Sequence, residues 1–417
     1  MTIENASEEG LPQSRPSAEP NQIPVKKPVG WTQSPGAKFI MVGFITVILL
    51  VPALLVWGIV DERSRRATSV ANSISQGWGG QQTLNGPFLV LPYIVDKTVG
   101  DKVVQETRQA VFSAEKMSFD ADVDVEERRK SIYSIPLFQG KFKMKGRFAA
   151  PDLKSIRAVS GRPDFANAFL VMGVSDNSGF RSDVLAKLDG GKALSFEPGL
   201  GQLRNKNRGG GIHLPLSNLV VGKAFDFEID MVLNGSRSLT VVPAGKNTDL
   251  TVKSNWPHPG FDGRFLPLER DISETGFTAT WSVPYLARGI GAVWLSSTLP
   301  PAGSVVTINF VEPLKFYQII TRTLKYSIAF FALTFLAVFI LEQTGRKAVH
   351  WIQYILVGLA MVIFYILLLA LAEHVGFNIA YLVSAVATTG LIAWYVGDAL
   401  GPRHSSLIMG AVLGVSY

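Results

Sequence analysis

The sequence predicts a polytopic α-helical membrane bundle joined to a large β-rich domain, sandwich-like and mainly antiparallel, outside the cytoplasm. Three observations predict this fold: long runs without charge, charge concentrated in the middle of the chain, and a change of periodicity to two in that middle part. The last 94 of the 417 residues carry only seven charged side chains, whereas residues 61–323 carry 58. The middle part matches an average soluble domain in charge, so one uniform soluble fold is excluded.

The first segment of the chain, residues 1–38, contains six prolines and few large apolar side chains. Such a segment buries too little surface to offset its ordering entropy, so we predict a disordered cytoplasmic tail. Residues 39–60 follow without a charge, and about 20 apolar residues span a bilayer. We predict a transmembrane anchor here. A cleaved signal peptide is the alternative, but Asp61-Glu62-Arg63 follows the apolar run at once.

Residues 324–417 predict a C-terminal membrane bundle with helices at about 324–341, 351–371 and 377–396. A further helix begins at 407 and reaches only 417. Eleven residues are too few to span, so we expect a fragment of a longer chain. Basic residues in short loops mark the cytoplasmic side. They occur at Arg346, Lys347 and Arg403, which places residues 61–323 in the periplasm and the N-terminus in the cytoplasm.

Apolar and polar residues alternate strictly in three parts of the middle segment, at 119–126, 141–148 and 225–231. This period predicts strands with one buried face, and polar outer faces favour an antiparallel sandwich. The acidic outer face of 120–126 is expected to pair across with the basic outer face of 141–147. Asn234-Gly235 after the third run predicts a hairpin turn.

Composition and motifs exclude several classes of chemistry. The chain has no cysteine, which excludes disulfides, thiolate zinc sites and cysteine nucleophiles. The five histidines are scattered without ligand spacing, so we expect no metal site. No catalytic or cofactor motif is present, and we predict neither an enzyme nor a cofactor. The basic stretch 204–208 holds no aromatic residue, which favours a solvated loop over nucleic-acid binding.

Three places remain as candidate sites. Trp256, His258 and Phe261 combine aromatic faces with a titratable ring and suit a ligand pocket, although aromatics of such a loop also cap sandwiches. Asp176 and Glu197 would suit glycoside hydrolysis if held roughly 5–10 Å apart, but both stand in ordinary turn sequences.

The third place is Glu373-His374, at the end of a membrane helix. An ionisable pair there is either a proton relay or an interfacial pair reached by water. A relay would support transport through the bundle, whereas an interfacial pair would be structural.

Long ordered motifs along residues 39–417 resemble the CreD family of bacterial inner-membrane proteins. The motifs are Trp351–Ala360, Phe364–His374, Asp61-Glu62-Arg63, Trp78-Gly79, Gln82-Thr83-Leu84, Gly86-Pro87, Gly173–Asp176, Trp256–Pro259 and Leu286–Gly289. The resemblance adds Arg288 as a ligand-binding candidate. It implies a role in envelope maintenance and stress, with colicin tolerance and links to two-component signalling. It supplies no catalytic residues to transfer, and it implies that the C-terminal end of the family is missing here.

The leading hypothesis is a non-enzymatic inner-membrane protein, embedded in the lipid bilayer, whose periplasmic domain binds an envelope component. That component is a protein, a cell-wall fragment or a lipid. A transporter or flippase using the bundle and Glu373-His374 is the alternative. A membrane-anchored hydrolase using Asp176 and Glu197 is a third reading. The sequence sets no oligomeric state.

Overall fold

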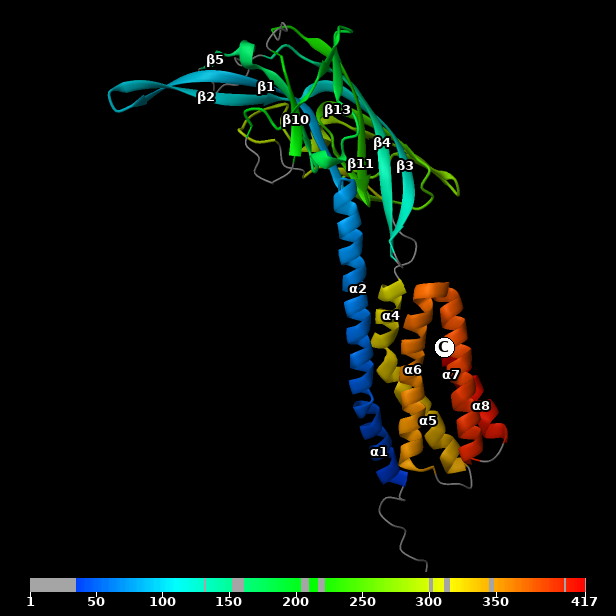
Figure 1. The fold of residues 1–417 in the computed structure, drawn as a ribbon. Helices are drawn as coiled ribbons and strands as arrows, with labels where there is room; N and C mark the ends of the chain where they lie inside the picture. The colour runs from blue at the N-terminus through cyan, green and yellow to red at the C-terminus, as the bar shows by residue number, and fades with distance from the viewer. Residues whose placement is uncertain are drawn as a thin grey trace, which may run out of the picture. The chain divides into compact units, whose positions relative to one another are not determined.

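The computed structural model describes residues 35–130, 133–151, 161–203, 210–216, 222–299, 303–310, 316–344, 349–400 and 403–416. The first 34 residues of the expected tail, the basic stretch 204–208 and the loop cations Arg346 and Lys347 lie outside these residues. The chain divides into two compact units. A helical unit comprises residues 1–54, 326–364 and 384–417, and a β unit comprises residues 55–325 and 365–383. Figure 1 shows the helices and strands of both units.

The described residues form seven helices of ten or more residues. They are α1 (Pro35–Ile48), α2 (Leu50–Trp78), α4 (Phe316–Lys325), α5 (Ser327–Thr344), α6 (Trp351–Val375), α7 (Phe377–Leu400) and α8 (Arg403–Ser416). In the described part of the chain, four helical runs are long and apolar enough to cross a membrane: 36–78, α5, α6 and α7. The expected helix at 324–341 starts later, because a turn at Tyr326 separates α4 from α5.

Helix α2 continues well beyond its apolar part. Ion pairs one turn apart support its polar half, Arg65 with Asp61 at 2.9 Å and Arg66 with Glu62 at 3.1 Å. Each such pair contributes roughly 0.3–0.5 kcal/mol. The helix ends before Gly79, which has a φ of 108°. A Cβ there would lie 2.7 Å from the Gly179 Cα, so the close approach requires glycine.

The described residues of the β unit form two sheets. Its strands are β1 (Gln82–Val99), β2 (Lys102–Phe112), β3 (Ala114–Lys130), β4 (Tyr133–Phe148), β5 (Arg162–Pro163), β6 (Phe169–Val174), β7 (Leu185–Leu188), β8 (Ala193–Ser195), β9 (Glu197–Pro198), β10 (Gly210–Pro215), β11 (Phe225–Ser236), β12 (Ser238–Val242), β13 (Gly245–Ser254), β14 (Pro259–Gly263), β15 (Glu269–Ser273), β16 (Gly276–Val283), β17 (Val293–Leu295) and β18 (Val306–Phe310). A short helix, α3 (Tyr285–Arg288), follows β16.

Among the described residues, sheet A has the order β14-β18-β12-β1-β6-β10-β9, with β2, β5 and β17 beside this path. Sheet B has the order β15-β16-β13-β3-β4-β11-β7-β8. Most neighbouring strands are antiparallel, but β1 pairs with β12 and β3 with β13 in parallel. The long β1–β2 hairpin extends past the other strands (Figure 1). The predicted antiparallel sandwich is thus confirmed in class and includes one parallel pair in each sheet.

One apolar core lies between the sheets and joins side chains from both. Phe138 of β4 packs against Phe310 of β18 with ring centroids 5.3 Å apart. Phe261 of β14 meets Trp281 of β16 edge to face at 5.7 Å. Aromatic pairs of this geometry add about 0.5–1.5 kcal/mol beyond their buried area. The opposite face of sheet B points away from this core and is the outer face of the sheet.

The three alternating runs form strands β3, β4 and β11, as the period of two predicts. The prediction of a hairpin turn at Asn234-Gly235 is wrong. Strand β11 continues through both residues to Ser236, and Gly235 lies opposite Phe138 of β4. A Cβ on Gly235 would lie 2.3 Å from the Phe138 ring, so this glycine allows close packing and makes no turn. The chain leaves sheet B at Arg237, which has a φ of 61°.

Candidate functional site

The outer face of sheet B carries opposite charges on neighbouring strands. Because side chains alternate across a strand, one face of β3 presents Asp120 and Asp122, and β4 presents Lys143 and Lys141 directly opposite them. Lys143 in turn lies opposite Asp230 of β11. The predicted pairing of the acidic and basic faces is therefore confirmed. Each exposed cross-strand pair contributes roughly 0.2–1 kcal/mol.

Strand β11 supplies acids for the cations of β4. Glu228 lies 3.2 Å from Lys145 and 3.4 Å from Lys143, and Asp226 lies 3.1 Å from Arg147. Hydrogen bonds from Lys145 and Lys143 lower the pKa of the Glu228 carboxyl. The acids of β11 are therefore engaged with the β4 cations.

This charge ladder breaks at Ser118 of β3. Ser118 lies opposite Lys145, where the pattern of Asp120 and Asp122 would place an acid. The next outward residue, Lys116, lies opposite Arg147, which brings two cations together. Like charges directly opposite each other are destabilising. The break is thus a local excess of positive charge on β3 and β4.

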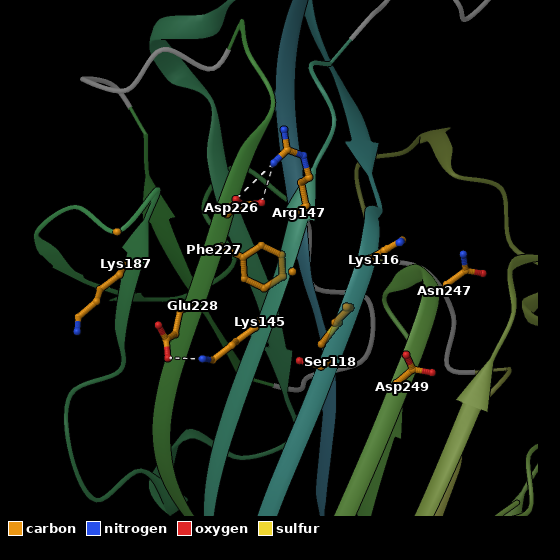
Figure 2. A pocket seen from close by; sticks show the side chains of 13 residues that line it. Lys116, Ser118, Lys145, Arg147, Lys187, Asp226, Phe227, Glu228, Asn247 and Asp249 are labelled. Atoms are coloured by element: carbon orange, nitrogen blue, oxygen red, sulfur yellow. Dashed lines mark hydrogen bonds and ion pairs between the residues drawn. The ribbon is translucent and has the colours of Figure 1, made fainter.

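A depression of about 600 Å³ opens at the same place. Figure 2 shows Ser118 in its centre with the ion pairs of Lys145 and Arg147 beside it. The depression is lined by Lys116, Met117, Ser118, Lys145, Gly146, Arg147, Lys187, Gly190, Asp226, Phe227, Glu228, Asn247 and Asp249. Its volume lies in the range of small-molecule sites, roughly 300–1,000 Å³.

Two lysines at this depression are available for a ligand. Among the described residues, Lys116 and Lys187 form no ion pair with an acid of the chain. On the β13 side, the Asn247 amide oxygen accepts from the Tyr285 backbone at 3.3 Å, and Asp249 accepts from the Ser282 hydroxyl at 2.7 Å. No group of metal-ligating side chains occurs in the residues the structure describes. The depression suits a polar ligand held by hydrogen bonds and charge.

The end of α2 is fixed to sheet B. The Trp78 ring lies 4.5 Å from the guanidinium carbon of Arg128 and 4.9 Å from that of Arg181. Its indole nitrogen donates to the Phe138 carbonyl at 3.3 Å. Cation–π contacts contribute about 0.5–2 kcal/mol each. Trp78 thereby couples the helix to strand β3 and to the chain before β7.

A second set of contacts fixes the same end of α2. Ser75 and Ser236 share a hydrogen bond, and Arg237 donates to Asn72 at 3.0 Å. The buried Gln82 amide donates to backbone carbonyls of Gly79, Asp176 and Asn234. A displacement of the sheets therefore requires a displacement of the helix.

Glu373 joins three helices of the β unit. Its carboxyl accepts a hydrogen bond from the Tyr317 hydroxyl of α4 at 3.1 Å and lies 3.8 Å from Arg63 of α2. His374, the other member of the expected pair, is exposed. Local sequence patterns indicate neither Tyr317 nor Arg63 as a partner of Glu373. The position of Arg63 just past the first apolar run is the signal that could have indicated it.

The aromatic residues of the 256–263 segment lie in the core. The Trp256 side chain is buried, and its indole nitrogen donates to the His258 carbonyl at 3.2 Å. Phe261 packs on Phe277 and Trp281. The His258 side chain is exposed. The geometry gives the two aromatics a packing role and leaves only the imidazole facing solvent.

Asp176 and Glu197 make separate local contacts. Asp176 caps a short 3₁₀ turn (Asn177–Gly179) by accepting from the Ser178 backbone at 2.9 Å. Glu197 lies on β9, 3.7 Å from the His213 ring on β10. Within the described residues, no hydrogen bond or ion pair joins the two carboxyl groups. Each thus has a local structural partner.

Arg288 is fully buried in the β unit and is 1% exposed. Its guanidinium donates to the carbonyls of Ala244 and Gly245 and to the Ser113 hydroxyl at 3.0 Å. The Ser304 hydroxyl donates to the Arg288 carbonyl at 2.7 Å. Burial lowers the pKa of this guanidinium. Arg288 ties three connections between strands together, and its charge is turned toward backbone oxygens.

The helical unit contains a buried ionic cluster that the local sequence patterns do not predict. Glu342 of α5 pairs with Lys38 of α1, and it accepts from the Val349 backbone at 2.9 Å and the Tyr354 hydroxyl of α6 at 2.9 Å. The Glu342 side chain is 3% exposed and that of Lys38 is 14% exposed. A buried carboxylate requires such partners, because an unpaired buried charge costs several kcal/mol.

Comparisons with known proteins give one family. Residues 34–417 match the family described as "Inner membrane protein CreD". The "Inner membrane protein CreD" of Escherichia coli (strain K12) is 35% identical over 354 residues, which cover 82% of this chain and 76% of that protein. Among solved structures, an M1 zinc metallopeptidase from Deinococcus radiodurans matches with a TM-score of 0.24 and 9% identity, over 48% of this chain and 42% of that chain. At that TM-score the likeness supports no inference.

Proposed function

Because this chain belongs to the CreD family of inner membrane proteins, we propose that it binds an envelope component through its β unit and passes the bound state to the membrane helices. In this proposal residues 61–323 are periplasmic, the N-terminal segment is cytoplasmic, and no covalent chemistry takes place. The role is envelope maintenance under stress. The component is a protein, a cell-wall fragment or a lipid.

The fixed end of α2 is the observation that carries this proposal. One uninterrupted helix, 50–78, begins with apolar residues of a membrane span and ends at Trp78, which contacts Arg128 of sheet B and Arg181. A domain that served only as a passive cover would need no such coupling. The depression at Ser118 supplies an open place for the bound component on the face turned away from the core.

Binding is tested with the full-length chain in lipid nanodiscs. Purified cell-wall glycopeptides, vesicles of envelope lipids and purified envelope proteins are titrated in turn, and the bound amount is measured against concentration. We expect saturable binding of at least one of them. Binding to none of the three classes would contradict the proposal.

Replacing Trp78 with alanine should separate ligand binding from transmission of the bound state to the membrane helices. The variant loses both cation–π contacts and the hydrogen bond to Phe138, so the end of α2 keeps only the contacts of Ser75 and Asn72 and its coupling to sheet B is weakened. We expect its affinity for the envelope component to stay within about twofold, because Trp78 lies outside the residues that line the depression. Its complementation of a strain lacking the family member, measured as colicin sensitivity, should be lost. Trp78→Phe keeps an aromatic ring for both arginines and should retain much of that activity.

Transport through the bundle is the second candidate, and the position of Glu373 favours it, since an ionisable side chain at a membrane helix end is a functional candidate. Replacing Glu373 and His374 together with glutamine should then abolish complementation. The ties of Glu373 to Tyr317 and Arg63 favour a structural role instead, for which we expect complementation to persist at a reduced level. Wild-type complementation by the double variant would remove transport through this pair.

A further inference from the structure

We infer that the depression around Ser118 binds an anionic oxygen group, a carboxylate or a phosphate, carried by the ligand of the β unit. The inference rests on the proposed binding function and names its place and its chemistry. Three features of the described residues support it: a missing acid on β3, a lysine without an ion pair, and open space at the same position.

The missing acid is evident from the register of β3 and β4. Asp120 faces Lys143 and Asp122 faces Lys141, yet Lys145 faces the neutral Ser118. A serine side chain is shorter than an aspartate side chain and carries no charge. An anionic group from a ligand, placed above Ser118, would occupy the position that an acid of β3 takes in the neighbouring rows.

The unmatched cation, Lys116, lies one row further along the strands. Lys116 faces Arg147, and Asp226 pairs with Arg147 from the far side. Lys116 thus lies opposite the cation Arg147. Among the described residues, no acid of the chain forms an ion pair with Lys116. An arrangement that is unfavourable in the free protein is typical of a functional site, where the ligand supplies the compensating charge.

Neighbouring groups decide where the anionic group would lie. Asp249 of β13 is across from Ser118 on the other side and would repel it. Asn247 lies opposite Lys116 and retains its amide hydrogens as donors. The favourable position is therefore between Lys116 and Lys145, with the Ser118 hydroxyl below and the Asn247 amide beside it. Lys187 extends the positive charge toward β7 (Figure 2).

The test replaces Ser118 with aspartate, which completes the ladder from within the chain. The full-length protein in nanodiscs is titrated with two probes, inorganic phosphate and a short acetylated peptide with a free C-terminal carboxylate, and the shift of the unfolding midpoint is followed. The amide of the same peptide is the uncharged control. We expect a saturable shift with phosphate, with the carboxylate peptide or with both, and the stronger probe identifies the source of the anionic group.

Four variants, one of them a control outside the depression, locate the site. In S118D the affinity for the active probe should fall at least tenfold, while the midpoint without probe stays the same or rises. Ser118→Asn fills nearly the same space without charge and should lose clearly less affinity than S118D. Lys116→Gln should weaken binding about fivefold or more. Lys141→Gln removes a cation of the same ladder outside the depression and should bind as the unaltered protein does.

Three results would overturn the inference: no saturable shift with either probe, undiminished affinity in S118D, or equal losses in S118D and Ser118→Asn. The envelope titrations separate this failure from that of the proposed function. If an envelope component binds S118D and the unaltered protein equally well, the anionic site is wrong and the binding function stands. If no envelope component binds the unaltered protein, the binding function itself fails.

Discussion

Replacing Arg288 with methionine is expected to lower the unfolding midpoint of the β unit by about 10 °C, which corresponds to a loss of about 3–5 kcal/mol. The variant removes the guanidinium donor from three buried acceptors, the carbonyls of Ala244 and Gly245 and the hydroxyl of Ser113, of which the Gly245 carbonyl still accepts from the Thr248 hydroxyl. Each buried group left unpaired costs roughly 1–3 kcal/mol. Thermal unfolding of the full-length protein, followed by tryptophan fluorescence, measures the change.

Two further variants make this result specific to the buried guanidinium. Arg288→Lys keeps a cation but cannot reach all three acceptors, so its midpoint should lie between those of the unaltered protein and the methionine variant. Arg270 on β15 is exposed, and Arg270→Met should change stability by at most about 0.5 kcal/mol. Equal midpoints for the Arg288 and Arg270 methionine variants would show that the buried hydrogen bonds contribute little.

Replacing Glu342 with alanine is expected to destabilise the helical unit by about 3–5 kcal/mol. The change leaves Lys38 largely buried without its counter-charge and removes the acceptor for Val349 and Tyr354. Resistance to proteolysis and the unfolding midpoint in detergent measure the effect. Asp398→Asn, an exposed acid on α7, is the control and should behave as the unaltered protein does.

A double-mutant cycle isolates the ion pair within this cluster. Glu342→Gln removes the charge and keeps one acceptor oxygen in place of the two that accept from Val349 and Tyr354, and Lys38→Met removes the opposite charge. If the pair is coupled, the double variant should be less destabilised than the sum of the single variants, by at least about 1 kcal/mol. Simple additivity would indicate that Lys38 and Glu342 act independently.

Much of the fold follows from local sequence patterns. The period of two predicts β3, β4 and β11, because each strand buries one face and exposes the other. The signs of the exposed charges also predict the pairing of β3 with β4, since opposite charges attract across strands. The apolar runs predict the membrane helices for the same reason, because length and lack of charge are properties of a single segment.

The sites depend on relations between distant residues, which local patterns do not contain. Ser118 is an ordinary serine until the register places it opposite Lys145. Glu342 and Lys38 lie in different helices, and nothing near either one indicates the other. Asn234-Gly235 has the composition of a turn, but pairing with Gln139 and Phe138 keeps it extended, so tertiary contacts override the local preference.

The two parallel pairs have a consequence for how the chain acquires its structure during synthesis. Residues 82–85 of β1 pair with residues 239–242, and residues 114–123 of β3 pair with residues 245–254. Central strands of both sheets therefore keep an open edge until ribosomes have made the second half of the domain. Such distant pairings slow folding, and open edges favour aggregation. Nascent chains that end before about residue 254 should thus depend on chaperones, although their early hairpins are complete.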